Sequence, residues 1–423
     1  MSHIHRRDFL KLGAFSATGL TTAALLAHES ATRRSTPARN VILVWLAGGP
    51  ATIDMWDLKR DAPSSIRGEF RSISTAAKGI EICEHLPKLA GLMQECTLIR
   101  SVSHTIAEHG QGTEYVTTGN PISPSLKYPS IGSVVAARLD VNQEVPVYIE
   151  MDELNIGQAG YLGSTYNAFQ VNSVSNRRDQ AATPDPFLLQ KGMTVQDLTR
   201  RKTLLQSLET GFERFGNQQR ARVMNRFQQQ AMSILAGGKT RQALDLSEED
   251  SQTQARYGFG LGRSALTARR LIERGARFVT IGLRGWDTHS NNFTQLRETL
   301  LPQLDRALSA LISDLKNRGL LQETIVYCVG EFGRTPVINS QGGRDHWARA
   351  MSILITGGGF RRGFVYGSTE KTGSEPASNA CSPADVNATI LNQLGIPPDT
   401  LLTTRSGRPL QVFRNGQILT GII

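Results

Sequence analysis

Short apolar runs recur along the chain, and each is bounded by polar residues or glycine. The first, Val41–Leu46, is apolar throughout and is followed by Gly48-Gly49-Pro50. A run without alternation between apolar and polar positions is typical of a strand buried on both faces, as in a parallel sheet. The same pattern predicts strands at residues 145–149, 277–281, 324–329 and 351–355.

The segments between these runs have the spacing of amphipathic helices. The clearest stripe repeats every three or four residues, at Phe293, Leu296, Leu300, Leu304, Leu308, Leu311 and Leu315. Further helices are predicted at 261–274 and 384–394. Strands that alternate with helices predict an α/β fold, with a mostly parallel central sheet and helices on both faces. In such sheets, ligands bind beyond the carboxyl ends of the strands.

The N-terminal segment predicts export. His5-Arg6-Arg7 precedes Asp8-Phe-Leu-Lys11, and a short, weakly apolar stretch rich in small residues extends to Ala27. This order of charge and apolar character is typical of a secretory signal, and the arginine pair resembles the twin-arginine signal. A cytoplasmic basic helix is the alternative. We predict a signal peptide and linker over 1–39, with cleavage near Ala27, and a single domain over 40–423 with a helical insertion near 190–255. The expected location is the periplasm or the exterior, and the expected partner is the twin-arginine export machinery.

Composition removes several other classes. The 423 residues carry a net charge of +10, but the positive residues are scattered and no long basic run is present, so nucleic-acid binding is not expected. No later stretch has the roughly 18 uninterrupted apolar residues of a spanning helix, so the mature protein is expected to be soluble, without a stable membrane anchor. The four cysteines lack zinc-site spacing, although Cys83 and Cys96 could form one disulfide.

The residues that carry chemistry follow the predicted strands. Asp287 and His289 follow the strand at 277–281, and Glu331 and Arg334 follow the strand at 324–329; Arg344, Asp345 and His346 lie in a loop that can reach the same edge. Imidazole and carboxylate groups are the usual ligands of zinc and similar divalent ions. Hydrogen-bonded loops contain the same pairs, so both interpretations remain open. Arg334 and Arg344 could bind an oxyanion, or be surface charges.

Several of these segments resemble the domain-of-unknown-function 1501 family, across nearly the whole of the mature chain. The matching segments are Gly48–Asp57, Arg269–Val279, Gly285–His289, Gly330–Pro336 and Gly343–Trp347. That family looks like a branch of the alkaline phosphatase and sulfatase superfamily, and Ser382–Ile396, Gly407–Leu410 and Thr118-Gly119 are similar to sulfatase segments. The resemblance implies an alkaline-phosphatase-like α/β/α fold.

The resemblance also implies roles for individual residues. Asp287, His289 and His346 would hold one divalent ion, Zn or Ca, Mg or Mn. Glu331 would replace the aspartate of the superfamily's second metal pair, with Phe332 in place of its histidine, so that one or two ions are expected. Asp54 would be the carboxylate after the first strand, although it lies several residues later than usual.

One position departs from the sulfatase pattern. His109, in Glu108-His109-Gly110, occupies the segment where sulfatases carry a cysteine or serine nucleophile. It could act as a nucleophile, a metal ligand or a general base, and metal-activated water could attack without a protein nucleophile. His104 and Thr113 are weaker candidates, and Trp286 and Trp347 are expected to wall the site.

Three functions fit these observations. The first is an exported metal-dependent hydrolase of phosphate or sulfate esters, acting on an anionic small molecule or a glycan ester, with Arg334 or Arg344 stabilising the anion. The second is a metal-dependent anion- or glycan-binding protein without turnover. The third is an exported scaffold without a metal.

Overall fold

An eight-stranded sheet lies at the centre of the computed structural model, which describes residues 36–139, 144–171, 200 and 238–423. The strands follow one another across the sheet in the order β12 (Phe364–Tyr366), β4 (Cys96–Val102), β11 (Met351–Thr356), β8 (Thr324–Val329), β1 (Asn40–Ala47), β7 (Phe278–Arg284), β5 (Tyr148–Met151) and β6 (Phe169–Val171). Only β11 runs antiparallel to its neighbours, β4 and β8; every other pairing is parallel. The predicted mostly parallel sheet is therefore confirmed.

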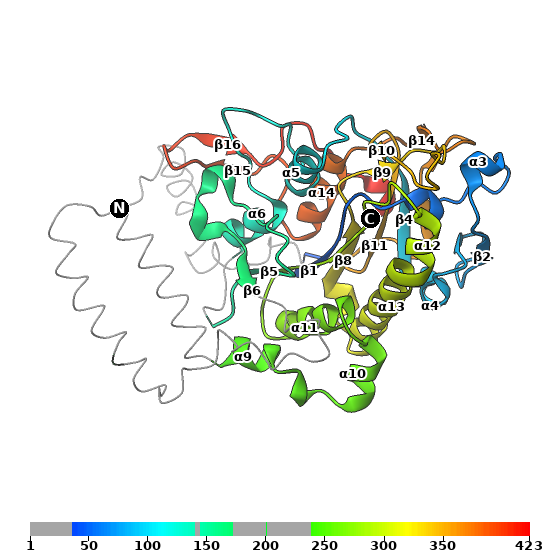
Figure 1. Cartoon of the computed structure of the whole chain (residues 1–423). Helices are drawn as coiled ribbons and strands as arrows, with labels where there is room; N and C mark the ends of the chain where they lie inside the picture. The colour runs from blue at the N-terminus through cyan, green and yellow to red at the C-terminus, as the bar shows by residue number, and fades with distance from the viewer. Residues whose placement is uncertain (1–35, 140–143, 172–199, 201–237) are drawn as a thin grey trace, which may run out of the picture. The chain divides into compact units, whose positions relative to one another are not determined.

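Helices cover both faces of this sheet (Figure 1). One face carries α11 (Leu261–Glu273) and α13 (Leu301–Asn317), and the other carries α5 (His109–Thr118), α6 (Ile131–Arg138) and α14 (Pro383–Gln393). Smaller elements are α3 (Ser64–Arg67), α4 (Pro87–Ala90), α9 (Lys239–Leu244), α10 (Ser251–Tyr257) and α12 (Asn292–Gln295), with the strand pairs β2 (Ser72–Ser74) and β3 (Glu81–Cys83), β9 (Gly333–Arg334) and β10 (His346–Trp347), β13 (Ser368–Thr369) and β14 (Pro376–Ser378), and β15 (Leu401–Thr403) and β16 (Pro409–Gln411).

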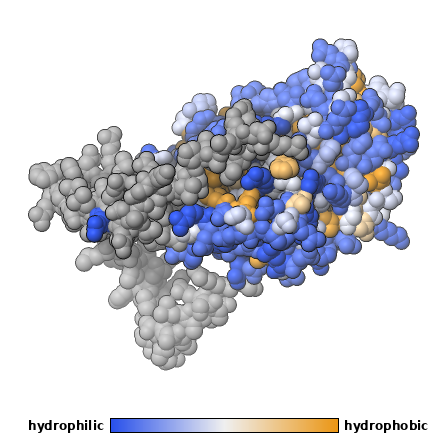
Figure 2. Space-filling view, turned by 60° about the horizontal axis from the view of Figure 1, so that its bottom comes forward, coloured by the Kyte–Doolittle hydropathy of each residue, from blue (hydrophilic) through white to orange (hydrophobic). Residues whose placement is uncertain are grey.

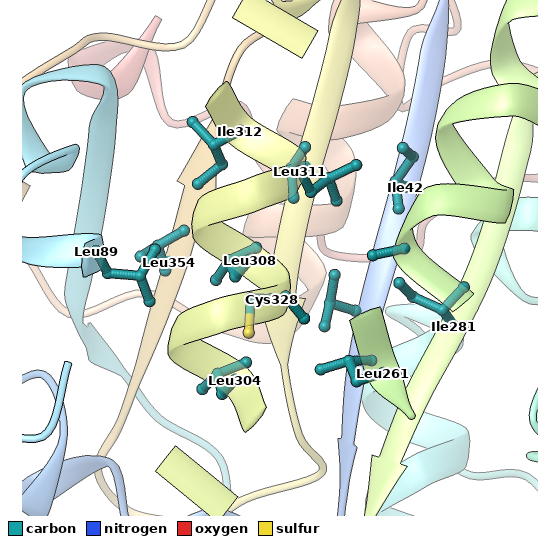
Figure 3. Close-up of a cluster of buried hydrophobic side chains, with 14 of the residues drawn as sticks. Ile42, Leu89, Leu261, Ile281, Leu304, Leu308, Leu311, Ile312, Cys328 and Leu354 are labelled. Carbon is teal, nitrogen blue, oxygen red and sulfur yellow. The ribbon is translucent and has the colours of Figure 1, made fainter. Parts of the chain in front are cut away.

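Strand β1 shows why its sequence is apolar throughout. Ile42 and Val44 belong to the hydrophobic cluster under α11 and α13, whereas Leu43 and Trp45 belong to the cluster under α5, α6 and α14. All four side chains are buried because successive residues of a strand point to opposite faces. Figure 3 shows the first cluster, in which the apolar stripe of α13 lies against β1, β7, β8 and β11.

The fold brings distant segments to one edge of the sheet. Strands β1, β4, β7 and β8 have their carboxyl ends there, and the antiparallel β11 begins there, so the loop before β11 arrives at the same place. The short pair β9 and β10 follows β8 and precedes β11. This edge holds the segments that the sequence marked as chemical.

Several expectations concern other parts of the chain. The predicted signal segment lies almost wholly outside the described residues, as does most of the proposed insertion; the part of it that is described contains α9 and α10. Within the described residues, no helix is long and apolar enough to span a bilayer. All four cysteines are buried free thiols, so no disulfide joins Cys83 and Cys96. The face that bears α9, α10 and α11 is mainly hydrophilic, with hydrophobic residues in small separate groups (Figure 2).

Candidate metal centre

The loop that follows β7 carries Asp287 and His289. It is held in place by the segment that precedes β10, because Arg344 donates its backbone N–H to the carbonyl of Thr288 over 3.2 Å. The two segments approach so closely that a Cβ atom on Gly343 would lie 1.9 Å from the backbone oxygen of His289. A residue with a side chain at position 343 would therefore displace the histidine loop.

His346 reaches the same place through β10. This two-residue strand pairs with β9, opposing His346 to Arg334. The Nδ1 atom of His346 lies 2.9 Å from the carbonyl oxygen of Ala107, a residue just before α5. Because a carbonyl only accepts, this ring must carry its proton on Nδ1, which leaves the lone pair on Nε2 free.

His109 is the first residue of α5. Glu108 caps this helix, since its carboxylate accepts the backbone N–H groups of Gly110 and Gln111, each over 2.8 Å. The capped start fixes where the His109 side chain leaves the helix. Gly112, one turn later, allows α5 to lie close to Glu331, whose Cβ would be 3.4 Å from a Cβ added there.

Asp287 and the imidazole Nε2 atoms of three histidines converge, and we call these four residues the histidine cluster: His109, Asp287, His289 and His346. Nε2 of His289 lies 3.0 Å from Nε2 of His346 and 3.1 Å from Oδ1 of Asp287. Nε2 of His346 is 3.2 Å from the same oxygen, and Nε2 of His109 is 3.4 Å from Oδ2. Ligand atoms of His109, Asp287 and His346 all lie within 4.8 Å of one another.

Every imidazole in the cluster has its other nitrogen bound to an acceptor. Nδ1 of His289 is 2.8 Å from Oδ1 of Asp345, and Nδ1 of His109 is 2.7 Å from Oε1 of Glu331. With the carbonyl bound to His346, these acceptors place a proton on all three Nδ1 atoms. Three lone pairs and a carboxylate then face one another without a shared proton, and a cation between them removes the repulsion.

The Asp287 carboxyl is kept ionised. Burial alone would raise its pKa, but the hydrogen bond from Arg334, over 2.5 Å, outweighs burial and lowers the pKa of Asp287 to about 2. Asp287 therefore provides a negative charge at any pH at which the protein is folded. The cluster is open to water, since the side chains of Asp287, His289 and His109 are 47%, 44% and 38% exposed.

Glu331 lies beneath His109, and only one of its oxygens is bonded. Oε1 accepts the backbone N–H of Gly48 over 2.9 Å as well as the imidazole of His109. Oε2 is buried and has no hydrogen-bond partner. His104 is a structural neighbour, because its Nε2–H donates to the carbonyl of Glu331 over 2.9 Å and burial lowers its pKa to about 4. Glu331 thus holds the His109 ring and keeps one carboxylate oxygen available.

Asp54 and Arg344 lie outside the histidine cluster. Both side chains are almost fully buried, and the two carboxylate oxygens of Asp54 accept Nε and Nη2 of Arg344, each over 2.8 Å. The remaining donors of Arg344 bind the carbonyls of Ile66, Thr335 and Pro336. The pair therefore supports the loops from behind, and the structure brings Asp54 to Arg344 and Asn292 rather than to the histidines.

The guanidinium of Arg334 also faces inward. Its donors bind the carbonyls of Gly48, Gly49, Arg344 and Trp286, together with the carboxylate of Asp287. The side chain is fully buried. Arg334 thus positions Asp287 and ties β9 to the loop after β1, and it does not extend into the open side of the cluster.

Sequence reasoning missed two supporting side chains. Asn339 donates to the carbonyl of His289 over 2.9 Å and to Asp345 over 3.2 Å, and no local pattern marks it within its long loop. Phe332, fully buried, lies against the rings of His109 and His346, with centroid distances of 5.1 and 4.5 Å. Trp286 is buried, and Trp347 bonds the carbonyl of Ser374. The wall of the imidazoles is therefore Phe332.

Acidification should weaken metal binding through the imidazoles and not through Asp287. A carboxyl whose pKa is lowered in the fold stays ionised until the pH falls toward that lowered value, here about 2. Imidazole must be neutral to bind a metal, so affinity should fall between about pH 8 and pH 5. Titration calorimetry with Zn²⁺ across this range measures the loss. Affinity that stayed constant down to about pH 4 would mean that carboxylates alone hold the ion.

The comparisons with solved structures place this architecture among known folds. A protein in the alkaline phosphatase superfamily from Vibrio parahaemolyticus is 14% identical, with 90% of this chain and 70% of that chain covered and a TM-score of 0.36. A phosphonate monoester hydrolase from Silicibacter pomeroyi is 12% identical, with 91% and 77% covered and a TM-score of 0.36. A sulfatase from Pseudoalteromonas sp. is 14% identical, with 88% and 70% covered and a TM-score of 0.33.

The search of curated proteins gave no match. One family model does match, over residues 38–423, and it spans every segment from which the histidine cluster is built. The match confirms the family resemblance seen in the sequence. The chain belongs to the DUF1501 family, described as a protein of unknown function.

Proposed function

We propose that the histidine cluster binds a divalent metal ion through Asp287, His289, His346 and His109. The observation that carries this proposal is the direction of the lone pairs: each Nδ1 is bound to an acceptor, and the three Nε2 atoms converge on one carboxylate. Asp345 and Glu331 act behind the cluster, where they orient the rings of His289 and His109. Carboxylate–histidine pairs of this kind are common around metal sites and raise the basicity of the ligand.

The donor set favours zinc or a similar first-row ion. Imidazole nitrogen suits Zn²⁺ and its neighbours, whereas Ca²⁺ and Mg²⁺ take mainly oxygen ligands. Three imidazoles and one carboxylate provide a set in which nitrogen predominates. The unpartnered Oε2 of Glu331 is the described position where a second cation or a proton could be held.

From this centre we infer a hydrolase of phosphate or sulfate esters. When bound, a divalent ion polarises the ester oxygen and makes a water molecule acidic enough to supply hydroxide near neutral pH. The exposed side of the cluster admits the ester, and Asp287 and the rings of His289 and His346 fix where it binds. The pair His109 and Glu331, joined over 2.7 Å, can accept and return a proton at the edge of the site.

One observation supports the binding protein as the second candidate. Among the described residues, the hydrogen bonds of the cluster's four side chains reach no serine, threonine or cysteine side chain. No acyl-type or phosphoryl-type nucleophile is therefore bonded to the site, and hydrolysis would depend on water alone. A site that holds a metal without positioning water would bind an anion or glycan without turnover.

Metal removal should abolish hydrolysis. The purified protein is assayed against aryl sulfate and aryl phosphate esters before and after treatment with a chelator, and again after Zn²⁺ is restored. We expect activity that disappears with the metal and returns with it. Activity that persists in metal-free protein would contradict the proposal, and a metal-loaded protein inactive on the whole ester panel would favour the binding function.

Export by the twin-arginine route is a separate proposal, and it rests on residues 5–27. Exchange of Arg6 and Arg7 for lysine keeps the charge but removes the paired guanidinium groups. We expect this variant to accumulate in the cytoplasm, whereas the unchanged chain reaches the periplasm or medium. Equal export of both would contradict the twin-arginine assignment.

A further inference from the structure

The charges around the histidine cluster are unusual for a site that would bind a doubly charged ester. The two arginines nearest to it in sequence, Arg334 and Arg344, are buried and bind backbone carbonyls and the carboxylates of Asp287 and Asp54. Neither presents an N–H group to the open side. An anion that enters the site therefore meets the metal and the ring edges, and no guanidinium.

The exposed groups beside the cluster are acidic. Asp345 is 57% exposed beside His289, and Glu108 is exposed where α5 begins, next to His109. Hydrogen bonds lower the pKa of both carboxyls: at Glu108 they come from the helix N–H groups of Gln111 and Gly110, and at Asp345 from His289. Both therefore carry a negative charge at neutral pH.

The total charge follows from these contacts. One divalent ion brings two positive charges and Arg334 brings one, and the carboxylates of Asp287, Glu331 and Asp345 cancel all three. With neutral imidazoles the loaded centre is neutral overall, and Glu108 makes its rim negative. A second negative charge on the substrate would then gain nothing from the site and would be repelled by Asp345 and Glu108.

We propose that the loaded site selects esters whose reacting group carries a single negative charge, namely sulfate monoesters, phosphodiesters and phosphonate monoesters, over dianionic phosphate monoesters. This inference rests on the proposed metal-dependent hydrolase and specifies its substrate class. Glu108 and Asp345 are the specificity-determining residues, since they place negative charge where the extra oxyanion of a phosphate monoester would lie.

Binding of two unreactive probes tests the proposal without relying on turnover. Phenylphosphonate, at a pH where it is a dianion, is compared with its monoethyl ester, a monoanion, by calorimetry on the zinc-loaded protein at low ionic strength. Two nearby carboxylates in a water-rich setting should make the monoanion bind about fivefold more tightly or better. Equal binding, or tighter binding of the dianion, would overturn the selectivity.

A variant isolates the effect of charge. Glu108→Gln keeps an oxygen that can cap α5 and removes one negative charge from the rim, so the preference for the monoanion should fall by about twofold or more. Asp250→Asn is the matched control, because Asp250 likewise caps a helix, α10, which lies on the helical layer away from the cluster (Figure 1). It should leave the preference unchanged. A preference insensitive to Glu108→Gln would mean that the rim charge does not set it.

The outcomes separate this inference from the proposed function. Zinc bound at one ion per chain with a preference for the dianion would leave the metal centre standing and overturn the charge selectivity. Two ions per chain would add two positive charges and overturn the charge count. A protein that binds neither zinc nor probe would contradict the metal centre itself, and the selectivity with it.

Discussion

Asp287→Ala should lose its metal. Asp287 provides the carboxylate on which three imidazole Nε2 atoms converge, and without it these groups have no anion to balance a cation. Loss of groups behind a metal ligand costs about 10- to 100-fold in affinity, so loss of a direct ligand should cost at least about 100-fold. Elemental analysis of protein purified without chelator, together with Zn²⁺ titration, measures the change.

A matched control is available on the same chain. His85 packs edge-to-face on Phe70, with ring centroids 4.6 Å apart, and it is not a member of the cluster. His85→Ala should retain the metal, whereas His289→Ala should lose it as Asp287→Ala does. Full metal content in both Asp287→Ala and His289→Ala would mean that the ion is held elsewhere or that none is required.

Asp54→Ala should be the most destabilising of the site substitutions. Asp54 and Arg344 form a buried pair with two hydrogen bonds, and removal of the carboxylate leaves a guanidinium in the interior without its counter-charge. Breaking a buried pair in this way costs about 3–5 kcal/mol of unfolding free energy. Denaturant unfolding of the metal-free protein measures this cost directly, because metal binding cannot then contribute.

The exposed ion pair of Arg39 and Glu323 provides the comparison. Glu323→Ala removes a carboxylate from a pair open to solvent and should change stability by less than about 1 kcal/mol. If Asp54→Ala were as mild as Glu323→Ala but lost metal, Asp54 would be a ligand, as the resemblance to the superfamily implied. The observed contacts predict the reverse order of effects.

The sequence predicted those elements whose burial is complete. Runs of apolar residues gave β1, β7, β8 and β11 to within a few residues, because strands covered on both faces contain few polar positions. The run at 145–149 was displaced: the strand is Tyr148–Met151, since Pro146 has no N–H to donate to a sheet. The long apolar stripe at 293–315 was correct, although the structure divides it into α12, a π-helical turn and α13.

Strand β4 escaped detection for a physical reason. Its sequence includes Thr97, Arg100 and Ser101, which interrupt the apolar pattern. In the fold, the hydroxyl of Thr97 donates to the carbonyl of Arg361 over 2.5 Å, and that of Ser101 donates to the carbonyl of Asn379 over 2.6 Å. Partners more than 260 residues away satisfy these groups, and a local pattern contains no trace of them.

The same limit applied to the site. The edge rule for parallel sheets was sufficient to bring Asp287, His289 and His346 together from residue order alone. The inward direction of Arg334 and Arg344 could not be foreseen, because it depends on carbonyls from several loops. His109 joined the cluster through α5, which follows β4, and β4 was not predicted. The resemblance to the sulfatases was the signal that singled out His109.

Crystals of the zinc-loaded protein, measured at the zinc absorption edge, would test the metal centre directly. We predict one strong anomalous peak between Asp287, His289, His346 and His109, with imidazole Nε2 atoms at about 2.0–2.1 Å from the ion. A peak that touches none of the three Nε2 atoms, or no peak in protein with full zinc content, would contradict the centre proposed from the directions of these lone pairs.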